Sequence, residues 1–99
     1  METFKAQTPA EEYGVGITRR SGVIRNGKPA AELTFESGAF SQLRKQMQGN
    51  TTHVVSGEFE FTVGAETHLL IAGESVNIPT NIISGCFCLS TGVLVETPL

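Results

Sequence analysis

Residues 53–85 read HVVSGEFEFTVGAETHLLIAGESVNIPTNIISG, and this stretch determines the fold predicted for the whole chain. Between positions 58 and 63 apolar and polar residues alternate, with Phe59, Phe61 and Val63 on one side, as in a strand buried on one face. Glycines at positions 57, 64 and 73 separate short segments rich in β-branched residues. The stretch therefore predicts short antiparallel strands joined by tight turns.

Strand signals continue on both sides of this stretch. Upstream, residues 30–36 alternate with Leu33 and Phe35 on one face, after a turn predicted at Asn26 and Gly27. Downstream, residues 82–90 and 93–96 have the composition of two further strands, whereas residues 40–49 are polar and irregular. About eight to ten strands at intervals of roughly 8 to 12 residues predict an antiparallel sandwich or barrel.

The length and composition indicate one small globular domain. The chain has 99 residues, of which 39% are hydrophobic and 17% are charged, and this suits a single hydrophobic core. We expect one domain over residues 1–99, with an N-terminal arm at 1–13 and the barrel at 14–99. The arm is expected to be extended or to form a turn of helix.

Several classes of partner are excluded by the same composition. Ten acidic residues outnumber seven basic ones, and no nucleic-acid-binding motif surrounds Arg19, Arg20 and Arg25, which are expected on a solvated strand edge. No apolar run is long enough to cross a membrane, and the first residues lack the apolar stretch of a signal peptide. With only two cysteines, Cys86 and Cys88, the chain is predicted to be cytoplasmic, without nucleic-acid or membrane partners.

Residues 53–85 resemble the centre of the small single-domain cupins, close to those named as pectin-degradation or uronate-processing proteins. Gly57 ends the first motif of that family, and Gly73 is followed after five residues by Pro79, which opens the second motif. Asn81 stands where a glycine or asparagine is usual. The resemblance implies an all-β, RmlC-like fold, the cupin-type double-stranded β-helix or jelly-roll barrel.

The resemblance also implies where a metal would be bound, and the residues there are the wrong ones. Two histidines, a carboxylate or amide residue and a last histidine fall on Arg44, Gln46, Asn50 and Ser84. None of them is a histidine, and Arg44 carries a fixed positive charge that repels a metal ion. We therefore expect no metal site and no cofactor, with a metal bound elsewhere as an alternative.

The two histidines are placed by the alternation of side chains along a strand. If Asn50 faces the interior, Thr52 and Val54 do so too, and His53 faces outward. His68 shares a face with Leu70, which is expected inside, so His68 is a weak catalytic candidate or a rim or core residue. One imidazole does not make a metal site.

The resemblance implies a polar pocket inside the barrel at the four former ligand positions, and the same alternation adds the two cysteines, which share a face with Ser84. Its predicted residues are Arg44, Gln46, Asn50, Ser84, Cys86 and Cys88. A guanidinium, two amides and a hydroxyl suit an anionic oxygen, which either a ligand carboxylate or phosphate supplies or, as the resemblance implies, Glu96 of the same chain. In the alternative interpretation Arg44 lies on a mobile surface loop and points into water. Cys86 and Cys88 either pack in the core as small hydrophobes or have a redox or soft-metal role.

Two functional hypotheses follow, and the sequence leaves open whether the protein is an enzyme. In the first, a metal-free cupin binds a small anionic or carbohydrate-like ligand. In the second, a metal-independent lyase or isomerase acts on a sugar-acid-like substrate with Arg44 and either Glu96 or His68. Outward apolar residues such as Val55 and Phe87 predict a homodimer, to which the N-terminal arm could cross.

Overall fold

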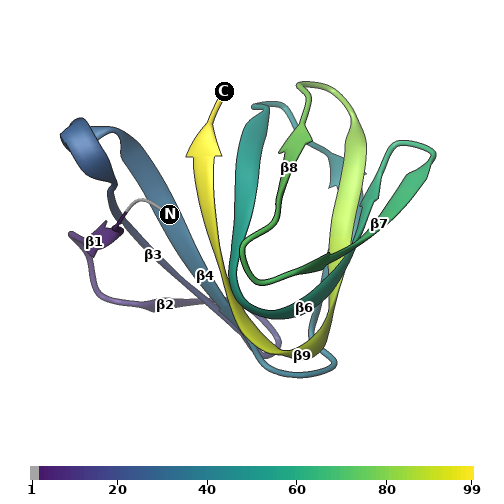
Figure 1. Cartoon of the computed structure of the whole chain (residues 1–99), viewed down its shortest axis with the longest axis horizontal. Helices are drawn as coiled ribbons and strands as arrows, with labels where there is room; N and C mark the ends of the chain where they lie inside the picture. The colour runs from purple at the N-terminus through teal and green to yellow at the C-terminus, as the bar shows by residue number, and fades with distance from the viewer. Residues whose placement is uncertain (1–2) are drawn as a thin grey trace.

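The computed structural model describes residues 3–99. Met1 and Glu2, the first residues of the expected arm, lie outside the described residues. Within 3–99 the chain is all-β and antiparallel, with one short 3-10 turn and no α-helix (Figure 1). None of the described residues forms a helix that is long and apolar enough to cross a membrane. The elements are β1 (Lys5–Ala6), β2 (Glu11–Gly14), β3 (Ile17–Val23), η1 (Arg25–Gly27), β4 (Pro29–Phe35), β5 (Phe40–Lys45), β6 (Asn50–Val63), β7 (Glu66–Ile71), β8 (Ser75–Ile78) and β9 (Ile83–Pro98).

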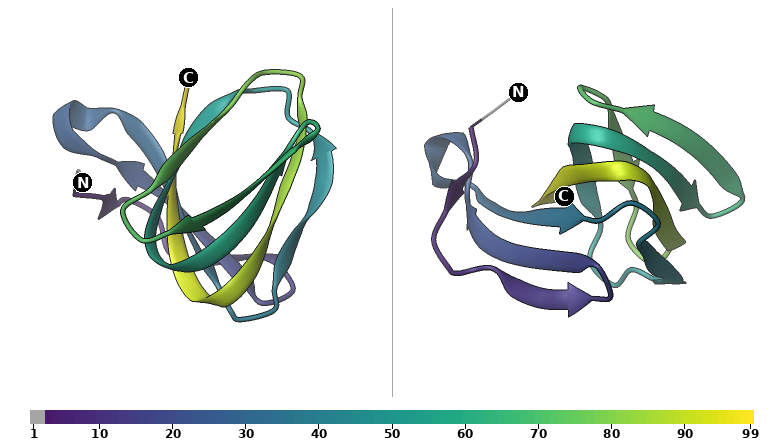
Figure 2. Two further views of the ribbon diagram at one scale, coloured as in Figure 1. Left: turned by 45° about the vertical axis from the view of Figure 1, so that its right-hand side comes forward. Right: turned by 90° about the horizontal axis from the view of Figure 1, so that it is seen from below.

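The strands form two facing sheets that share β6 and β9. One sheet contains β3, β4, the second half of β9, the first half of β6 and β8. The other contains β5, the first half of β9, the second half of β6 and β7. Figure 1 shows β6 and β9 bending together at the bottom of the barrel, and the left view in Figure 2 shows the open end opposite this bend. The predicted double-sheet barrel is confirmed.

Glycine makes the bend of β6 and β9 possible. Gly57 has a φ of +82°, and a Cβ atom there would lie 2.7 Å from the Cα atom of Gly92. Any side chain at Gly57 would therefore collide with the backbone of β9 and strain its own backbone. The pairing of the two strands shifts register on both sides of this point, between Val54 and Phe59.

The hydrophobic core lies between the two sheets, below the open end. The Phe35 ring meets the Phe59 ring edge to face, with ring centroids 5.2 Å apart. Because Phe35 belongs to the first sheet and Phe59 to the second, this contact joins the two layers. The other buried core residues are Ile17, Ala31, Leu33, Val54, Phe61, Leu70, Ile78, Cys88 and Leu94.

The segment expected to be irregular contains a strand. Residues Phe40 to Lys45 form β5, which pairs antiparallel with the first half of β9. Gly85 allows the two backbones to approach, because a Cβ atom at that position would lie 2.7 Å from the carbonyl oxygen of Ser41. The strand lies at the edge of its sheet and is mostly exposed, so it lacks the alternation that marks a half-buried strand.

The N-terminal arm is extended and packs on its own chain. β1 and β2 both pair antiparallel with β3, on the side of β3 that faces away from β4. Gly22 makes room for the arm, because a Cβ atom there would overlap the carbonyl oxygen of Lys5. The expectation of a solvated strand edge around Arg19 and Arg20 was wrong, since β3 has neighbours on both sides.

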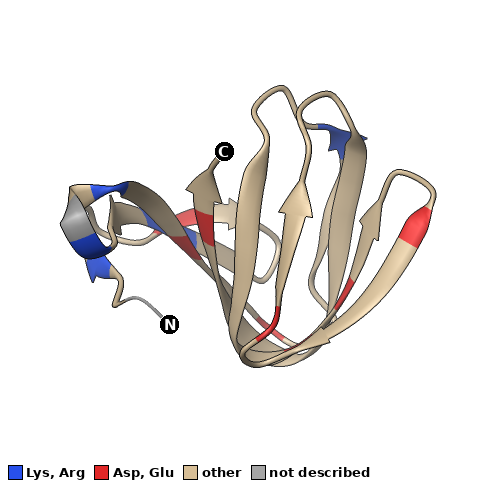
Figure 3. Ribbon diagram, turned by 45° about the horizontal axis from the view of Figure 1, so that its top comes forward, with Lys and Arg blue, Asp and Glu red and all other residues tan. Residues whose placement is uncertain are grey.

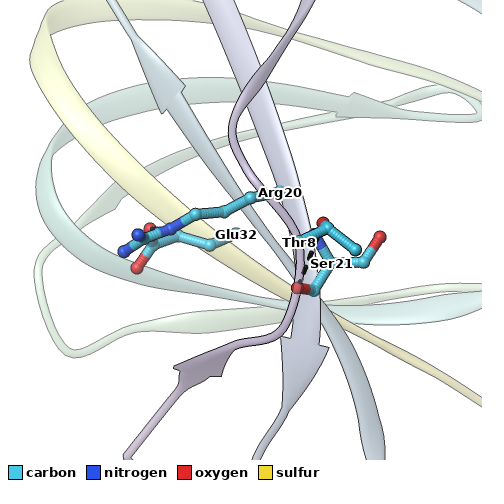
Figure 4. Close-up of polar contacts among 4 residues, drawn as sticks. All are labelled: Thr8, Arg20, Ser21 and Glu32. Carbon is cyan, nitrogen blue, oxygen red and sulfur yellow. Dashed lines mark hydrogen bonds and ion pairs between the residues drawn. The ribbon is translucent and has the colours of Figure 1, made fainter.

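Polar contacts hold the arm and the outer face of β3. The backbone N–H of Ser21 donates to Thr8 Oγ1 at 3.0 Å, and the Thr8 hydroxyl also reaches the Ser21 carbonyl at 3.4 Å. Arg20 Nε donates to Glu32 Oε1 at 2.7 Å across β3 and β4 (Figure 4). This exposed ion pair adds at most about 1 kcal/mol to stability.

Candidate ligand-binding site

A small cavity of about 70 Å³ lies inside the barrel at its open end, and we call it the inner cavity. Five of the six residues predicted for a pocket line it, namely Arg44, Gln46, Asn50, Ser84 and Cys86. Glu96, Tyr13, Ser41, Gly85 and apolar core residues complete the wall. A water molecule needs roughly 10–15 Å³ of such space, so the inner cavity has room for a few waters or one small polar group.

Strand register explains why these side chains meet. Arg44 of β5 and Val63 of β6 both pair with Ser84 of β9, so Ser84 lies in the middle of one sheet. Glu96, near the other end of β9, pairs with Thr52 of β6 in the facing sheet. Because β9 bends between these positions, its two ends supply opposite walls of the inner cavity.

Arg44 lies on a strand and has a defined contact. Its Nη2 atom donates a hydrogen bond of 3.0 Å to the hydroxyl of Tyr13, which belongs to β2 of the N-terminal arm. The guanidinium therefore sits at the mouth of the inner cavity and not on an irregular loop. Gln46 follows directly after β5, where its backbone N–H donates to Ile82 and its carbonyl accepts from Asn81.

Two polar side chains in the wall, those of Asn50 and Ser84, have hydrogen-bonding groups free for a ligand oxygen. Thr52 is fully buried and donates its hydroxyl to the Asn50 amide oxygen at 2.7 Å, which leaves the Asn50 NH₂ group to donate elsewhere. Ser84 is 1% exposed, and its hydroxyl oxygen has no hydrogen-bond partner among the described residues. A buried hydroxyl without a partner is costly, so a partner for it is expected in the inner cavity.

Burial shifts the pKa of two groups in the wall, Glu96 and Cys86. Burial raises the pKa of Glu96, while the positive charges of Arg19 and Arg44 oppose this shift. Burial also raises the pKa of Cys86 to about 12, and the charge of Glu96 adds to the effect. Cys86 is therefore a thiol at neutral pH and a poor nucleophile. Glu96 holds its proton to a higher pH than an exposed carboxyl group does.

Cys88, predicted for the pocket, does not line the inner cavity. It faces the barrel interior like Cys86 but is fully buried deeper in the core, with its thiol 3.0 Å from the carbonyl oxygen of Ser90. Burial raises the pKa of Cys88 as well. The rings of Phe35 and Phe61, which line the cavity from below, belong to the same core cluster as Cys88.

Neither histidine lines the inner cavity. His68 lies on β7 and pairs with Phe61 of β6. Its side chain is 42% exposed, and its Nε2 atom lies 3.6 Å from Glu66 Oε1. It shares a face with Leu70 as predicted, but the hairpin carries it towards solvent at the sheet edge. His53 contacts Ser75 Oγ through Nδ1 at 2.7 Å on the outside of the sheet. Of the acid–base candidates, only Glu96 faces the cavity.

The residues of the inner cavity do not fit a metal ion. A divalent transition metal prefers neutral imidazoles and anionic oxygens or sulfurs. The positions here hold a guanidinium, two amides and a hydroxyl, and the one thiol is protonated at neutral pH. Among residues 3–99 no group of three or more His, Cys, Asp or Glu side chains lies close enough to hold a metal ion.

Two residues near the site were not predicted from the sequence. Tyr13 lies in an arm segment without alternation, and no sequence signal pointed to it. Arg19 had a signal, because it shares the inward face of β3 with Ile17 and Ser21, where a cation is unusual. Its guanidinium carbon lies 5.8 Å from the centre of the Tyr13 ring, a cation–π contact.

Comparisons with known proteins agree with this architecture. No protein-family model matches the chain, and no curated protein sequence is similar to it. An RmlC-like cupin from Shewanella frigidimarina is 29% identical with a TM-score of 0.82, and the match covers 93% of this chain and 83% of that one. KdgF from Halomonas sp. is 21% identical with a TM-score of 0.78, over 93% of this chain and 87% of that one.

A third solved structure, a protein of unknown function from Acinetobacter sp., is 13% identical with a TM-score of 0.81, over 97% of this chain and 94% of that one. These three matches span nearly the whole chain, so they concern the entire barrel and not one motif. They confirm the fold that the sequence motifs around Gly57, Gly73 and Pro79 imply. The chain therefore has the cupin fold, and an RmlC-like cupin and KdgF are among its structural neighbours.

Proposed function

We propose that this protein is a metal-free small cupin that binds a small anionic or carbohydrate-like ligand in the inner cavity. The observation that carries the proposal is the Ser84 hydroxyl, which is buried, lines the cavity and has no partner among the described residues. A ligand oxygen would supply that partner. The cost of leaving such a group unpaired is about 1–3 kcal/mol.

The donors around Ser84 support an anionic oxygen as the bound group. Arg44 offers a planar fork of N–H donors, and the Asn50 NH₂ group is free to donate because its oxygen accepts from Thr52. These donors share the wall with one carboxyl group, that of Glu96. A carboxylate or phosphate oxygen accepts several hydrogen bonds at once, so it matches this wall better than a neutral carbonyl does.

The charge balance supports the same class of ligand. Among residues 3–99 the ion pairs are Arg20 with Glu32 and His68 with Glu66, so Arg44 has no carboxylate partner at ion-pair distance. Its one side-chain contact is the neutral hydroxyl of Tyr13. An anion bound at Arg44 would gain a charge-assisted hydrogen bond without breaking an existing ion pair.

A second candidate function is favoured by Glu96. A carboxyl group with a raised pKa, facing a cavity that also holds an arginine, is a typical arrangement for proton transfer next to a stabilised anion. In this alternative a metal-independent lyase or isomerase moves a proton on a sugar-acid-like substrate through Glu96. Arg44 would stabilise the negative charge that develops on the substrate carboxylate.

Calorimetric titration of purified protein tests the binding function. The probes are gluconate, galacturonate and glucose 6-phosphate, with wild type, Arg44→Gln and Lys45→Gln. Lys45 is the matched control, because it is the next residue of β5 and is also exposed but does not line the inner cavity. We expect at least one probe to bind wild type and K45Q equally and R44Q about tenfold more weakly, as for a lost hydrogen bond to a charged group.

Two results would contradict the binding function: no probe binds wild type, or R44Q binds as well as K45Q. The catalytic alternative has a separate readout. Proton–deuterium exchange at the carbon next to the carboxylate of a bound sugar acid is followed by NMR in wild type and Glu96→Gln. Exchange that is fast in wild type and absent in E96Q supports the alternative, and exchange absent from both rules it out for that probe.

A further inference from the structure

The inner cavity is too small for a whole sugar acid, so most of a ligand must lie in an adjoining groove. Two grooves share residues with the cavity. One has a volume of about 530 Å³, meets the cavity at Arg44 and is otherwise lined mainly by apolar residues and glycine. The other has a volume of about 470 Å³, shares Asn50 and Glu96 with the cavity, and contains Arg19. We call it the outer groove.

Small residues on β4 keep the outer groove open. Ser21 of β3 pairs with Ala31 of β4, and Ala31 pairs with Glu96 of β9, so the three lie in one row across the sheet. Only the methyl group of Ala31 stands between the side chains of Ser21 and Glu96. The groove runs over this gap, and Arg19, two residues before Ser21 on the same face, borders it.

Arg19 faces the groove with most of its donors free. Its Nη1 atom donates a hydrogen bond of 3.3 Å to Ser21 Oγ, and its guanidinium lies over the Tyr13 ring. Within residues 3–99 it has no carboxylate at ion-pair distance, unlike its neighbour Arg20, which pairs with Glu32 on the opposite face of the sheet. The Glu96 carboxyl lines the same groove and acts on Arg19 without forming an ion pair with it, so the free guanidinium donors remain available to an anion from outside the chain.

We propose that Arg19 is a second anion-binding residue, and that the ligand carries two anionic groups, one at Arg44 in the inner cavity and one at Arg19 in the outer groove. The inference rests on the proposed binding function. It narrows the ligand class to a dianionic, hydroxyl-rich compound such as a sugar diacid, because the outer groove offers the amides of Gln46, Gln48 and Asn50 as hydrogen-bonding groups for sugar hydroxyls.

The placement of the two arginines supports one ligand and not two separate ones. Arg44 and Arg19 contact the same Tyr13 side chain, the first at its hydroxyl and the second at its ring, so they lie within reach of one small molecule. The two come from different sheets of the barrel, Arg19 from β3 and Arg44 from β5, and Figure 3 shows separate Lys and Arg segments on the two sides of the molecule. The Glu96 carboxyl acts on both arginines without forming an ion pair with either, and a bound dianion would further reduce the repulsion between the two cations.

The test compares two sugar acids that differ in one group. Gluconate and glucarate have the same six-carbon chain, but glucarate has a second carboxylate in place of the terminal CH₂OH. Their dissociation constants are measured by calorimetry with wild type, Arg19→Gln and Arg20→Gln, after thermal melting has shown that each variant is folded. Arg20 is the matched control, because it is the adjacent arginine of β3 and faces away from the groove.

We expect glucarate to bind wild type about tenfold more tightly than gluconate, as for one added charged hydrogen bond. R19Q should lose that advantage while its gluconate affinity stays within about twofold of wild type, and R20Q should behave as wild type. If R19Q weakens both acids equally, or neither, Arg19 is not a second anion-binding residue, although the proposed binding function stands. If neither acid binds wild type, the binding function itself fails.

Discussion

Arg44 and Tyr13 are 31 positions apart in the sequence, and a 3.0 Å hydrogen bond joins their side chains at the mouth of the inner cavity. The same Tyr13 ring lies under the guanidinium of Arg19. One aromatic residue of the arm therefore positions two cations that come from different strands. Its hydroxyl contacts Arg44 and its ring contacts Arg19, so the two contacts can be removed separately by substitution.

Tyr13→Ala should lower the affinity for glucarate by roughly fivefold or more, because a hydrogen bond that holds Arg44 and a cation–π contact that holds Arg19 are lost together. Tyr13→Phe keeps the ring and should lose less. Calorimetric titration of the three proteins measures the difference. Equal losses in Y13A and Y13F would show that the ring has no part in holding Arg19. The stability of both variants should stay near wild type, since Tyr13 is 47% exposed.

Ser84→Ala should leave the ligand-free protein as stable as wild type or up to about 1 kcal/mol more stable, because it removes a buried hydroxyl that has no partner in the described structure. Thr52→Val is the matched control. It removes a buried hydroxyl that does have a partner, the Asn50 amide oxygen, and should cost about 1–2 kcal/mol. Urea denaturation measures both. A loss of stability in S84A as large as that in T52V would contradict the assignment of Ser84 to the ligand.

Glu96 should make the stability of the protein depend on pH. Its pKa is raised in the folded state, so the folded protein keeps this proton at a pH where the unfolded chain has released it. The resulting stabilisation is complete below the unfolded value, near 4.5, and is lost as the pH rises through the folded value. The titratable or charged groups that act on Glu96 are Arg19, Arg44 and Cys86.

Denaturation of wild type and Glu96→Gln between pH 4 and 8 checks this dependence. The free energy of unfolding of wild type, taken relative to E96Q, should fall as the pH rises over that range, because the glutamine has no proton to lose. A relative stability that rises with pH would mean that Arg19 and Arg44 lower the pKa by more than burial raises it. A constant difference would place the titration of Glu96 outside the range.

Added metal ions should not stabilise the protein. A site filled at 100 times its dissociation constant adds about 2.7 kcal/mol, which raises the melting temperature of a domain of this size by about 10 °C or more. We expect no shift with Mn, Fe, Ni or Zn salts, because Arg44, Gln46, Asn50 and Ser84 offer no set of metal ligands. A saturable rise with one metal ion per chain would overturn this expectation and point to another ligand set.

The outer face of the second sheet should bind a second copy of the chain. Phe40, Phe87, Glu60 and Leu69 form a row across β5, β9, β6 and β7, and the three apolar members are 58%, 42% and 60% exposed. Such a row is unusual on a monomer surface. Sedimentation at micromolar concentration should give a dimer for wild type, and a monomer when Phe40 and Phe87 are both replaced by serine.

Val15→Ser is the control for the dimer prediction. Val15 is apolar and 97% exposed, but it lies in the turn between β2 and β3, away from the row. V15S should therefore stay dimeric. A wild-type protein that sediments as a monomer at all concentrations would disprove the predicted homodimer.

The barrel was predictable because few other residue types could stand at its turns and in its core. Gly57 has a positive φ that a side chain would strain, so the glycine marks the turn. Phe59 and Phe61 alternate with glutamates, so the sequence also indicates the strand and its buried face. β5 was missed for the opposite reason. Phe40 and Leu43 are apolar but exposed at a sheet edge. Their strand has no buried face, so its sequence lacks the two-residue alternation of apolar and polar residues that predicts a strand.

The site was predictable where it depends on alternation and not where it depends on pairing between distant strands. The resemblance places Ser84 inside the barrel, and parity along a single strand then places Cys86 on the same inner face. Parity alone also put Cys88 in the pocket, because it says which face a residue occupies and not how deep the core reaches. Tyr13 could not be found, since its place at the cavity follows from the pairing of β2 with β3, which local sequence does not encode.

The arm that carries Tyr13 pairs as strands with β3 alone, and the barrel strands pair with one another without it. The wall of the inner cavity is thus made of two separable parts. Residues 3–14 can be exchanged as a cassette, with a new residue in place of the tyrosine, while every strand pairing of the barrel is kept. Ligand preference in such a protein can therefore change, in the laboratory or by natural selection, through substitutions in a short segment that leave the strand pairing of the barrel intact.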